Sequence, residues 1–199
     1  MEVSVGYRRL VLATMCLAFL VNLTAFPLLY GLQPYVAKYI YGTDQTGLGY
    51  MVAGAAFGAL VGSTVLSRFG TRVQAGRLMV MSCAAWYVFL LVFAHMTSPA
   101  GGIPLLFLGG LMQSISQVPM NAMLLRHSDE QIRGRVMGLR MLAIYGNVPG
   151  LLLAGPLIAA FGYPMTATIY CFIGVAFTVF IAVRWRTHLW RRDALANRR

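Results

Sequence analysis

Five amide side chains lie inside otherwise apolar stretches of this sequence, where they are able to make directional hydrogen bonds. Gln113, Gln117 and Asn121 are spaced four residues apart, so on a helix they share one face. Asn22 and Asn147 lie near the middle of two other apolar stretches, and Asn22, Gln113 and Asn147 are expected at a similar depth. An amide in hydrocarbon needs a partner, so we expect all five to face the inside of a helical bundle. They are candidates for lining a site for a polar substrate, and hydrogen bonding between helices is the alternative.

Small residues recur at helical spacing in two of the apolar stretches. The members are Gly54, Gly58 and Gly62 in the first, and Gly146, Gly150, Gly155 and Pro156 in the second. Glycines four residues apart lie on one face of a helix and let a neighbouring backbone approach closely. Such faces can serve static packing, or they can let helices slide and rock during a conformational change.

The elements that must position these groups are long runs without Asp, Glu, Lys or Arg. Of all residues, 59% are hydrophobic and 11% are charged, and the mean hydropathy is +0.71, whereas about a quarter of a soluble domain is charged. One bilayer crossing needs about 20 apolar residues, and turn residues at 98–102 and 162–164 divide the two longest runs. The sequence therefore predicts a single six-helix membrane domain over residues 1–199. Its helices are expected at about 10–30, 46–66, 78–95, 103–125, 136–161 and 164–183.

Two prolines fall in or just after the first of these helices. Pro27 and Pro34 are expected to kink it, because proline lacks the backbone N–H that an α-helix requires. The helix can nevertheless continue through residues 31–38, beyond the apolar run.

The positive charges lie on one side of the predicted helices. The net charge is +11, and all 16 Lys and Arg residues except Lys38 fall in residues 8–9, 68–77, 126–140 and 184–199. This is the distribution of the positive-inside rule, and it predicts cytoplasmic termini and a cytoplasmic 126–140 loop. It disfavours a nucleic-acid partner, and the basic tail 184–199 is expected near anionic lipid headgroups.

The six helices form two similar triplets. The first helix of each triplet carries a glutamine shortly before a proline, at Gln33-Pro34 and at Gln117-Val118-Pro119, and both second helices are rich in glycine. The triplets begin on opposite sides of the membrane. An inverted three-plus-three repeat of this kind is typical of secondary transporters.

Two segments resemble cytoplasmic loop motifs of the major facilitator superfamily. Residues 129–139, DEQIRGRVMGL, with the glycines that follow, are similar to the loop and eleventh helix of these transporters, most of all the exporters of drugs and siderophores. Residues 67–72, SRFGTR, resemble the degenerate second copy of the family's loop motif, although Ser67 stands where the family has an aspartate. The residues that carry the two motifs are Arg68, Gly70, Arg72, Arg133, Gly134 and Arg135.

The resemblance implies that the chain corresponds to helices seven to twelve of a twelve-helix carrier. A second six-helix half would then complete it, as a separate chain, a missing N-terminal half or a second copy. In the family the first, second, fourth and fifth helices of a half line the central cavity, and the third and sixth are peripheral. Arg133 and Arg135 are topological anchors in this interpretation, with a second possible role as an inside gate.

The predicted function is therefore transmembrane transport of a small organic molecule by alternating access, with export as the expected direction. The expected location is the plasma membrane, as a multi-pass protein of a bacterial inner membrane, in contact with lipid. The alternative is a truncated or non-transporting membrane module that pairs with another carrier half. No catalytic, metal or cofactor site is predicted. The sequence contains no group of nucleophile, base and acid residues, and Cys16, Cys83 and Cys171 fall in three different helices.

Overall fold

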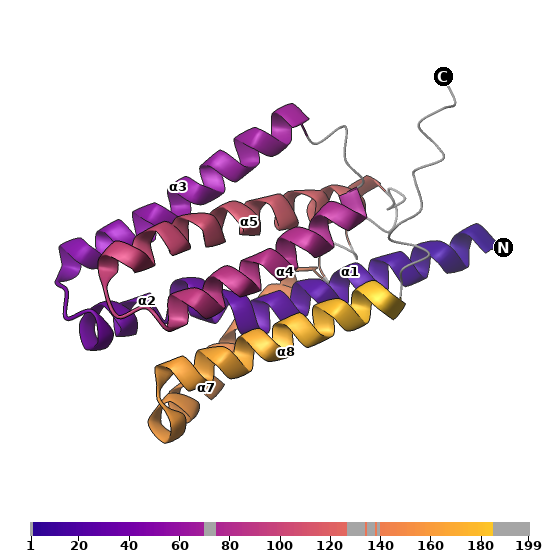
Figure 1. Ribbon diagram of the computed structural model, residues 1–199. Helices are drawn as coiled ribbons and strands as arrows, with labels where there is room; N and C mark the ends of the chain where they lie inside the picture. Colours follow the sequence, from indigo (N-terminus) through magenta and orange to yellow (C-terminus); the bar gives the residue numbers. More distant parts are fainter. Residues whose placement is uncertain (1, 70–74, 127–133, 135–137, 139, 185–199) are drawn as a thin grey trace.

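The computed structural model describes residues 2–69, 75–126, 134, 138 and 140–184. Helices connected by short turns make up this part of the chain, and it contains no strand (Figure 1). The elements are α1 (Glu2–Phe26), the π-helical turn η1 (Pro27–Gly31), α2 (Gln33–Tyr35), the π-helical turn η2 (Val36–Ile40), α3 (Gln45–Phe69), α4 (Ala75–Ala94), α5 (Pro99–Arg126), α7 (Asn147–Phe161) and α8 (Tyr163–Arg184).

Six of the described helical segments are long and apolar enough to cross a membrane. They are Thr14–Ile40, Gln45–Arg68, Gly76–Ala94, Pro99–Asn121, Arg140–Phe161 and Tyr163–Arg184. The predicted all-α membrane fold with six spans is confirmed, and the chain is a multi-pass membrane protein. The first span ends ten residues later than the predicted helix at 10–30, because the chain stays helical past both prolines.

Wider helical turns carry the first span past its prolines. The N–H of Leu32 donates to the carbonyl of Pro27 at 2.8 Å, and the N–H of Tyr41 donates to that of Val36 at 2.9 Å, both over five residues. Pro34 has no N–H to continue the four-residue pattern. Turns of π type keep backbone groups bonded at such places without ending the helix, and they often occur at functional sites.

The fifth span is interrupted just before α7. Pro149 cannot donate to the carbonyl of Tyr145, which instead accepts a bond from the N–H of Val148 at 3.1 Å. Gly146 likewise bonds the carbonyl of Ala143, three residues earlier, at 3.2 Å. These tighter bonds form a turn at residues 145–146 in the first third of the span, and α7 begins directly after it.

The helices pack with the two-fold pattern expected of an inverted repeat. If α1, α3 and α4 are one triplet and α5, α7 and α8 the other, the second helix of each packs against the first helix of the other, as α3 on α5 and α7 on α1 (Figure 1). The third helices follow the same rule, as α4 on α5 and α8 on α1, and α4 also packs against α8. This exchange of partners supports the three-plus-three organisation of one carrier half.

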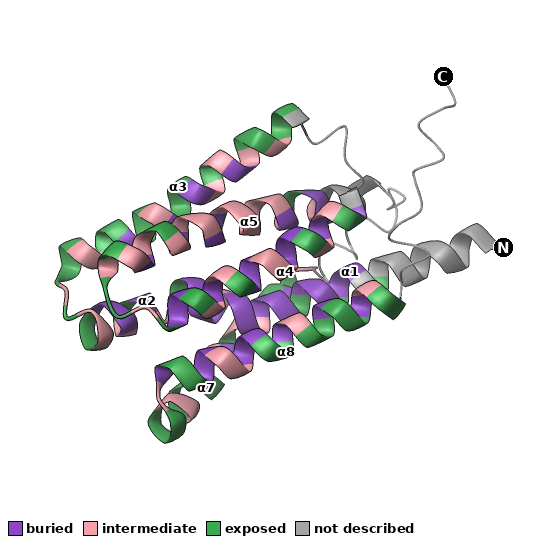
Figure 2. Ribbon diagram, viewed as in Figure 1, coloured by how far each residue is buried: buried purple, intermediate pink, exposed green. Residues whose placement is uncertain are grey.

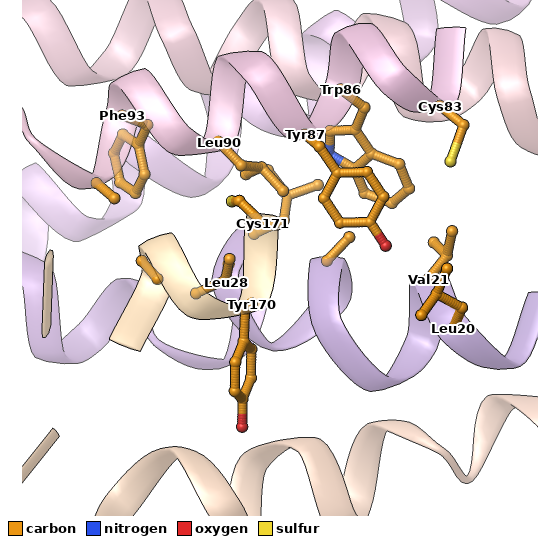
Figure 3. Close-up of a cluster of buried hydrophobic side chains, with 14 of the residues drawn as sticks. Leu20, Val21, Leu28, Cys83, Trp86, Tyr87, Leu90, Phe93, Tyr170 and Cys171 are labelled. Atoms are coloured by element: carbon orange, nitrogen blue, oxygen red, sulfur yellow. The ribbon is translucent and has the colours of Figure 1, made fainter. Parts of the chain in front are cut away.

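Aromatic side chains of α4 fill the space toward α1. Trp86, Tyr87 and Phe93 are fully buried, and Figure 3 shows them in the central cluster. The Trp86 ring meets Phe26 edge-on with centroids 5.5 Å apart, and the Tyr87 hydroxyl lies 2.6 Å from the hydroxyl of Thr24. As a result the first span, which contains most of α1, is the most enclosed. Of its most apolar 18-residue stretch, 67% is buried, against 22% for the spans of α3 and α7 (Figure 2).

Asp44 marks the start of α3 in the turn between the first two spans. Its carboxylate accepts a hydrogen bond from the N–H of Gly47 at 3.0 Å, which is the geometry of a helix N-cap. This bond lowers the pKa of the Asp44 carboxyl below its usual value.

Glycines make the contact between α3 and α5 a backbone contact. A Cβ atom on Gly58 would collide with the carbonyl of Phe107, and one on Gly62 would lie 2.6 Å from the carbonyl oxygen of Leu111. A Cβ on Gly150 of α7 would meet the carbonyl of Leu23 in α1 in the same way. The contact of α3 with α5 and the contact of α7 with α1 therefore both depend on the absence of a side chain at these glycines.

We expect Gly58→Ala to destabilise the protein by about 1–3 kcal/mol, because the new methyl group forces α3 away from the backbone of α5. Unfolding of the purified protein in mild detergent measures this. Gly49→Ala is the matched control on the same helix, since no heavy atom of the described chain lies within 4 Å of its Cβ position. A Gly58→Ala protein as stable as the Gly49→Ala protein would contradict the close-contact interpretation.

Candidate functional site

One face of α5 carries three of the five amide side chains that the sequence singled out. Gln113, Gln117 and Asn121 are all half-buried. They follow one another at single helical turns, about 6 Å apart along the axis. Two of them bond to residues of other segments, so this face links α5 to the first and fifth spans.

Gln113 is bonded to the first span. The hydroxyl of Tyr30 in η1 donates to the Oε1 atom of Gln113 at 2.8 Å. Tyr30 is 37% exposed and its ring stacks on Phe26, with centroids 5.9 Å apart. The pair is therefore a polar group on an uncovered side of the bundle.

Gln117 is bonded to the fifth span. The Nη2 atom of Arg140 donates to the Oε1 atom of Gln117 at 3.3 Å. The other terminal nitrogen, Nη1, is buried and has no hydrogen-bond partner in the described part of the chain. In the sequence, Arg140 directly precedes a run without Asp, Glu, Lys or Arg, residues 141–183, which contains α7.

The remaining amides differ from this pair. Asn22 is buried in α1, and its Nδ2 atom donates to the carbonyl of Ala18 in the same helix at 2.8 Å. Asn121 and Asn147 are half-buried, and the Oδ1 atom of each is buried without a hydrogen-bond partner among the described residues. The structure therefore brings Gln113 and Gln117 into contacts between spans, and it places Asn22 in a local bond within its own helix.

A stripe of exposed residues on α1 continues to Tyr30. Leu12, Cys16 and Phe19 are exposed at helical spacing, although most of the first span is buried. Phe19 also lies against α7, where its ring approaches the Cβ position of Gly146 to 3.0 Å. Together with α5 and Arg140, this stripe presents aromatic rings, a phenol hydroxyl, amides and a guanidinium close to one another. Such a set can bind a solute with both polar and apolar parts.

The predicted packing residues are not equivalent. Gly54, Gly58 and Gly62 lie against α5, and Gly146 and Gly150 lie against α1. Gly155 and Pro156 are exposed on α7, and no heavy atom of the described chain comes within 4 Å of the Cβ position of Gly155. The expected close approach at Gly155 is therefore not made within this part of the chain.

Most of the loop motifs lie outside the described residues. These are Gly70, Arg72, Arg133 and Arg135. Arg68 is exposed at the end of α3, and Gly134 is exposed. Among the described residues no three His, Cys, Asp or Glu side chains gather as metal ligands.

Sequence reasoning overlooked Tyr30 and Arg140. Tyr30 is the last residue of the first predicted helix and was given no functional role there, and Arg140 falls in the predicted cytoplasmic loop at 126–140. For Arg140 the sequence holds one signal, because it precedes Asn147 by seven residues, two helical turns on one face. For Tyr30 the π-type turn changes the direction of the side chain, and regular helical spacing does not predict that change.

We expect the Tyr30–Gln113 bond to couple the two residues energetically. In a double-mutant cycle, Tyr30→Phe and Gln113→Ala should be non-additive by about 0.6 kcal/mol, the usual size for a bond between membrane helices. Unfolding in mild detergent is the measurement. Tyr30→Phe combined with Gln117→Ala is the control pair and should be additive, because Gln117 bonds Arg140 instead. Equal coupling in both pairs would show that the effect is not due to this bond.

The sequence was compared with known families and proteins. Residues 11–197 match the family model described as Major Facilitator Superfamily. No curated protein and no solved structure matches the chain. The match covers almost the whole chain, and the narrower resemblance to drug and siderophore exporters stays a prediction.

Proposed function

The chain belongs to the major facilitator superfamily, and from this membership we propose that it exports a small organic molecule by alternating access. We propose that it acts as the C-terminal half of the carrier, closing a central cavity together with a second six-helix half. That half can be a separate chain, an N-terminal half of the same protein or a second copy.

The polar pair Tyr30–Gln113 is the observation that carries this proposal. Both residues belong to apolar spans, and their hydrogen bond lies on an exposed side of the bundle. Lipid chains offer no hydrogen bonds, so polar side chains at this depth face a protein interior or a water-filled cavity. We therefore assign the face formed by α5 and the α1 stripe to the central cavity. Gln113 and Gln117 would contact substrate there, while the Oδ1 atoms of Asn121 and Asn147 are buried in this conformation.

The glycine contacts supply a means of movement. Alternating access requires bundles of helices to rock against each other around the substrate site. The smooth backbone contacts of α3 on α5 and of α7 on α1 support such movement, because no interlocking side chains separate the helices at Gly58 and Gly150.

The charge distribution supports an orientation with cytoplasmic termini, and a bacterial inner membrane is the location that we propose. The described arginines Arg68, Arg77 and Arg184 all lie near the end of the bundle where α1 begins (Figure 1). Under the positive-inside rule this end faces the cytoplasm. Export would then take up substrate from the side where Arg140 lies.

We expect Gln113→Ala and Gln117→Ala each to change export by about fivefold, the effect of losing one hydrogen bond worth about 1 kcal/mol. Release of preloaded fluorescent dyes, fluorescein and ethidium among them, from cells that make the carrier measures this. Thr168→Ala is the control, because this hydroxyl bonds the carbonyl of Pro164 within the peripheral helix α8. If no dye is exported faster than from cells lacking the chain, the alternative of a non-transporting membrane module is preferred. Unchanged export of every dye by both glutamine variants would refute the lining role.

A further inference from the structure

Arg140 differs in its surroundings from four other cationic residues whose exposure the structure describes. Lys38, Arg68, Arg77 and Arg184 are all exposed, as expected for residues that anchor helix ends at the membrane surface. Arg140 is half-buried, and its Nη1 atom is inaccessible to solvent. Anchoring at the surface does not require a buried guanidinium.

The protein provides this guanidinium with one neutral partner and with no carboxylate from the neighbouring spans. Gln117 accepts a hydrogen bond from Nη2, while Nη1 has no partner among the described residues. No Asp or Glu occurs in residues 45–125 or 141–183. A guanidinium has five N–H donors and keeps its charge, and burying it without an anion is costly. Among the described residues, the guanidinium therefore has no anionic partner.

The surroundings indicate what else the ligand carries. Gln117 lies one helical turn, about 6 Å, from Gln113 and its partner Tyr30. Tyr30 stacks on Phe26, so an apolar ring surface begins where the amide face ends. A ligand bound to Arg140 could reach these rings with a body of one or two rings.

We propose that Arg140 binds the carboxylate or phosphate of an organic anion, whose apolar body lies along α5 toward Tyr30. Gln117 orients the guanidinium through its bond to Nη2. Nη1 is enclosed in this conformation and has no hydrogen-bond partner among the described residues, and it would donate to the anion when the cavity opens beside it. A planar guanidinium suits this role because it can bind either group through two parallel hydrogen bonds. The inference rests on the proposed transport function and names the substrate class of the same site.

The experiment uses the purified full chain in mild detergent and three probes. They are 2-naphthoate, the neutral isostere 2-naphthamide, and inorganic phosphate, and the dissociation constant of each is obtained from thermal stabilisation. We expect 2-naphthoate to bind about tenfold more tightly than 2-naphthamide, the ratio for one charge-assisted hydrogen bond. Arg140→Gln should abolish this preference, Arg140→Lys should keep part of it, and Arg68→Gln should leave it unchanged. Equal binding of naphthoate and naphthamide by the unaltered chain would overturn the proposal, even if a variant fails to fold.

Two further experiments make finer distinctions. The first distinguishes an organic anion from a lipid headgroup as the ligand of Arg140, and the second distinguishes the proposed substrate class from the proposed transport function. In vesicles, stabilisation through Arg140 that follows the phosphatidylglycerol content, and not added naphthoate, would assign the site to a lipid headgroup and overturn the proposal. Dye export gives the other distinction. Loss of fluorescein export in Arg140→Gln with ethidium export intact supports the substrate class. Equal export of both dyes by Arg140→Gln and the unaltered chain refutes it, while the transport function stands.

Discussion

Hydrocarbon forms no hydrogen bonds, and this one constraint determines most of the structure. Each polar group inside a span must find its partner within the protein. Hydroxyl groups do so locally, as where Thr24 donates to Leu20 and Thr178 to Gly174, four residues earlier. Backbone groups beside the prolines do so by changing the type of turn, to wider turns after Pro27 and tighter ones before Pro149. The bends that shape the first and fifth spans therefore follow from satisfying the backbone.

The same constraint makes the exceptions informative. Van der Waals packing holds membrane helices together, so the glycine contacts and the aromatic layer around Trp86 account for the close association of the six helices. Polar side chains add little to that association. Where they bond between spans on an uncovered side, as at Gln113 and Gln117, their presence suggests a function beyond packing.

The sequence predicted the parts of the structure that depend on length and average polarity. Six spans, the shared face of Gln113, Gln117 and Asn121, and the packing glycines of α3 all follow from hydropathy and a regular period of 3.6 residues. Features that depend on departures from that period could not be predicted. The π-type turn at Pro27 redirects Tyr30, and the turn at residues 145–146 interrupts the helix that was expected over 136–161. The exposure of Gly155 could not be predicted either, because the spacing of glycines in a sequence does not show which of them contact a neighbouring helix.

The cysteines of this chain have a practical consequence for studying its movements. Cys83 and Cys171 are buried in the central cluster, whereas Cys16 is exposed on the same stripe of α1 as Phe19 (Figure 3). A thiol reagent should therefore react first at one native position, beside the face assigned to the cavity. Among the three cysteines of this chain, Cys16 is therefore the accessible attachment point for a fluorescent or spin label, and the opening and closing of the carrier could be followed there.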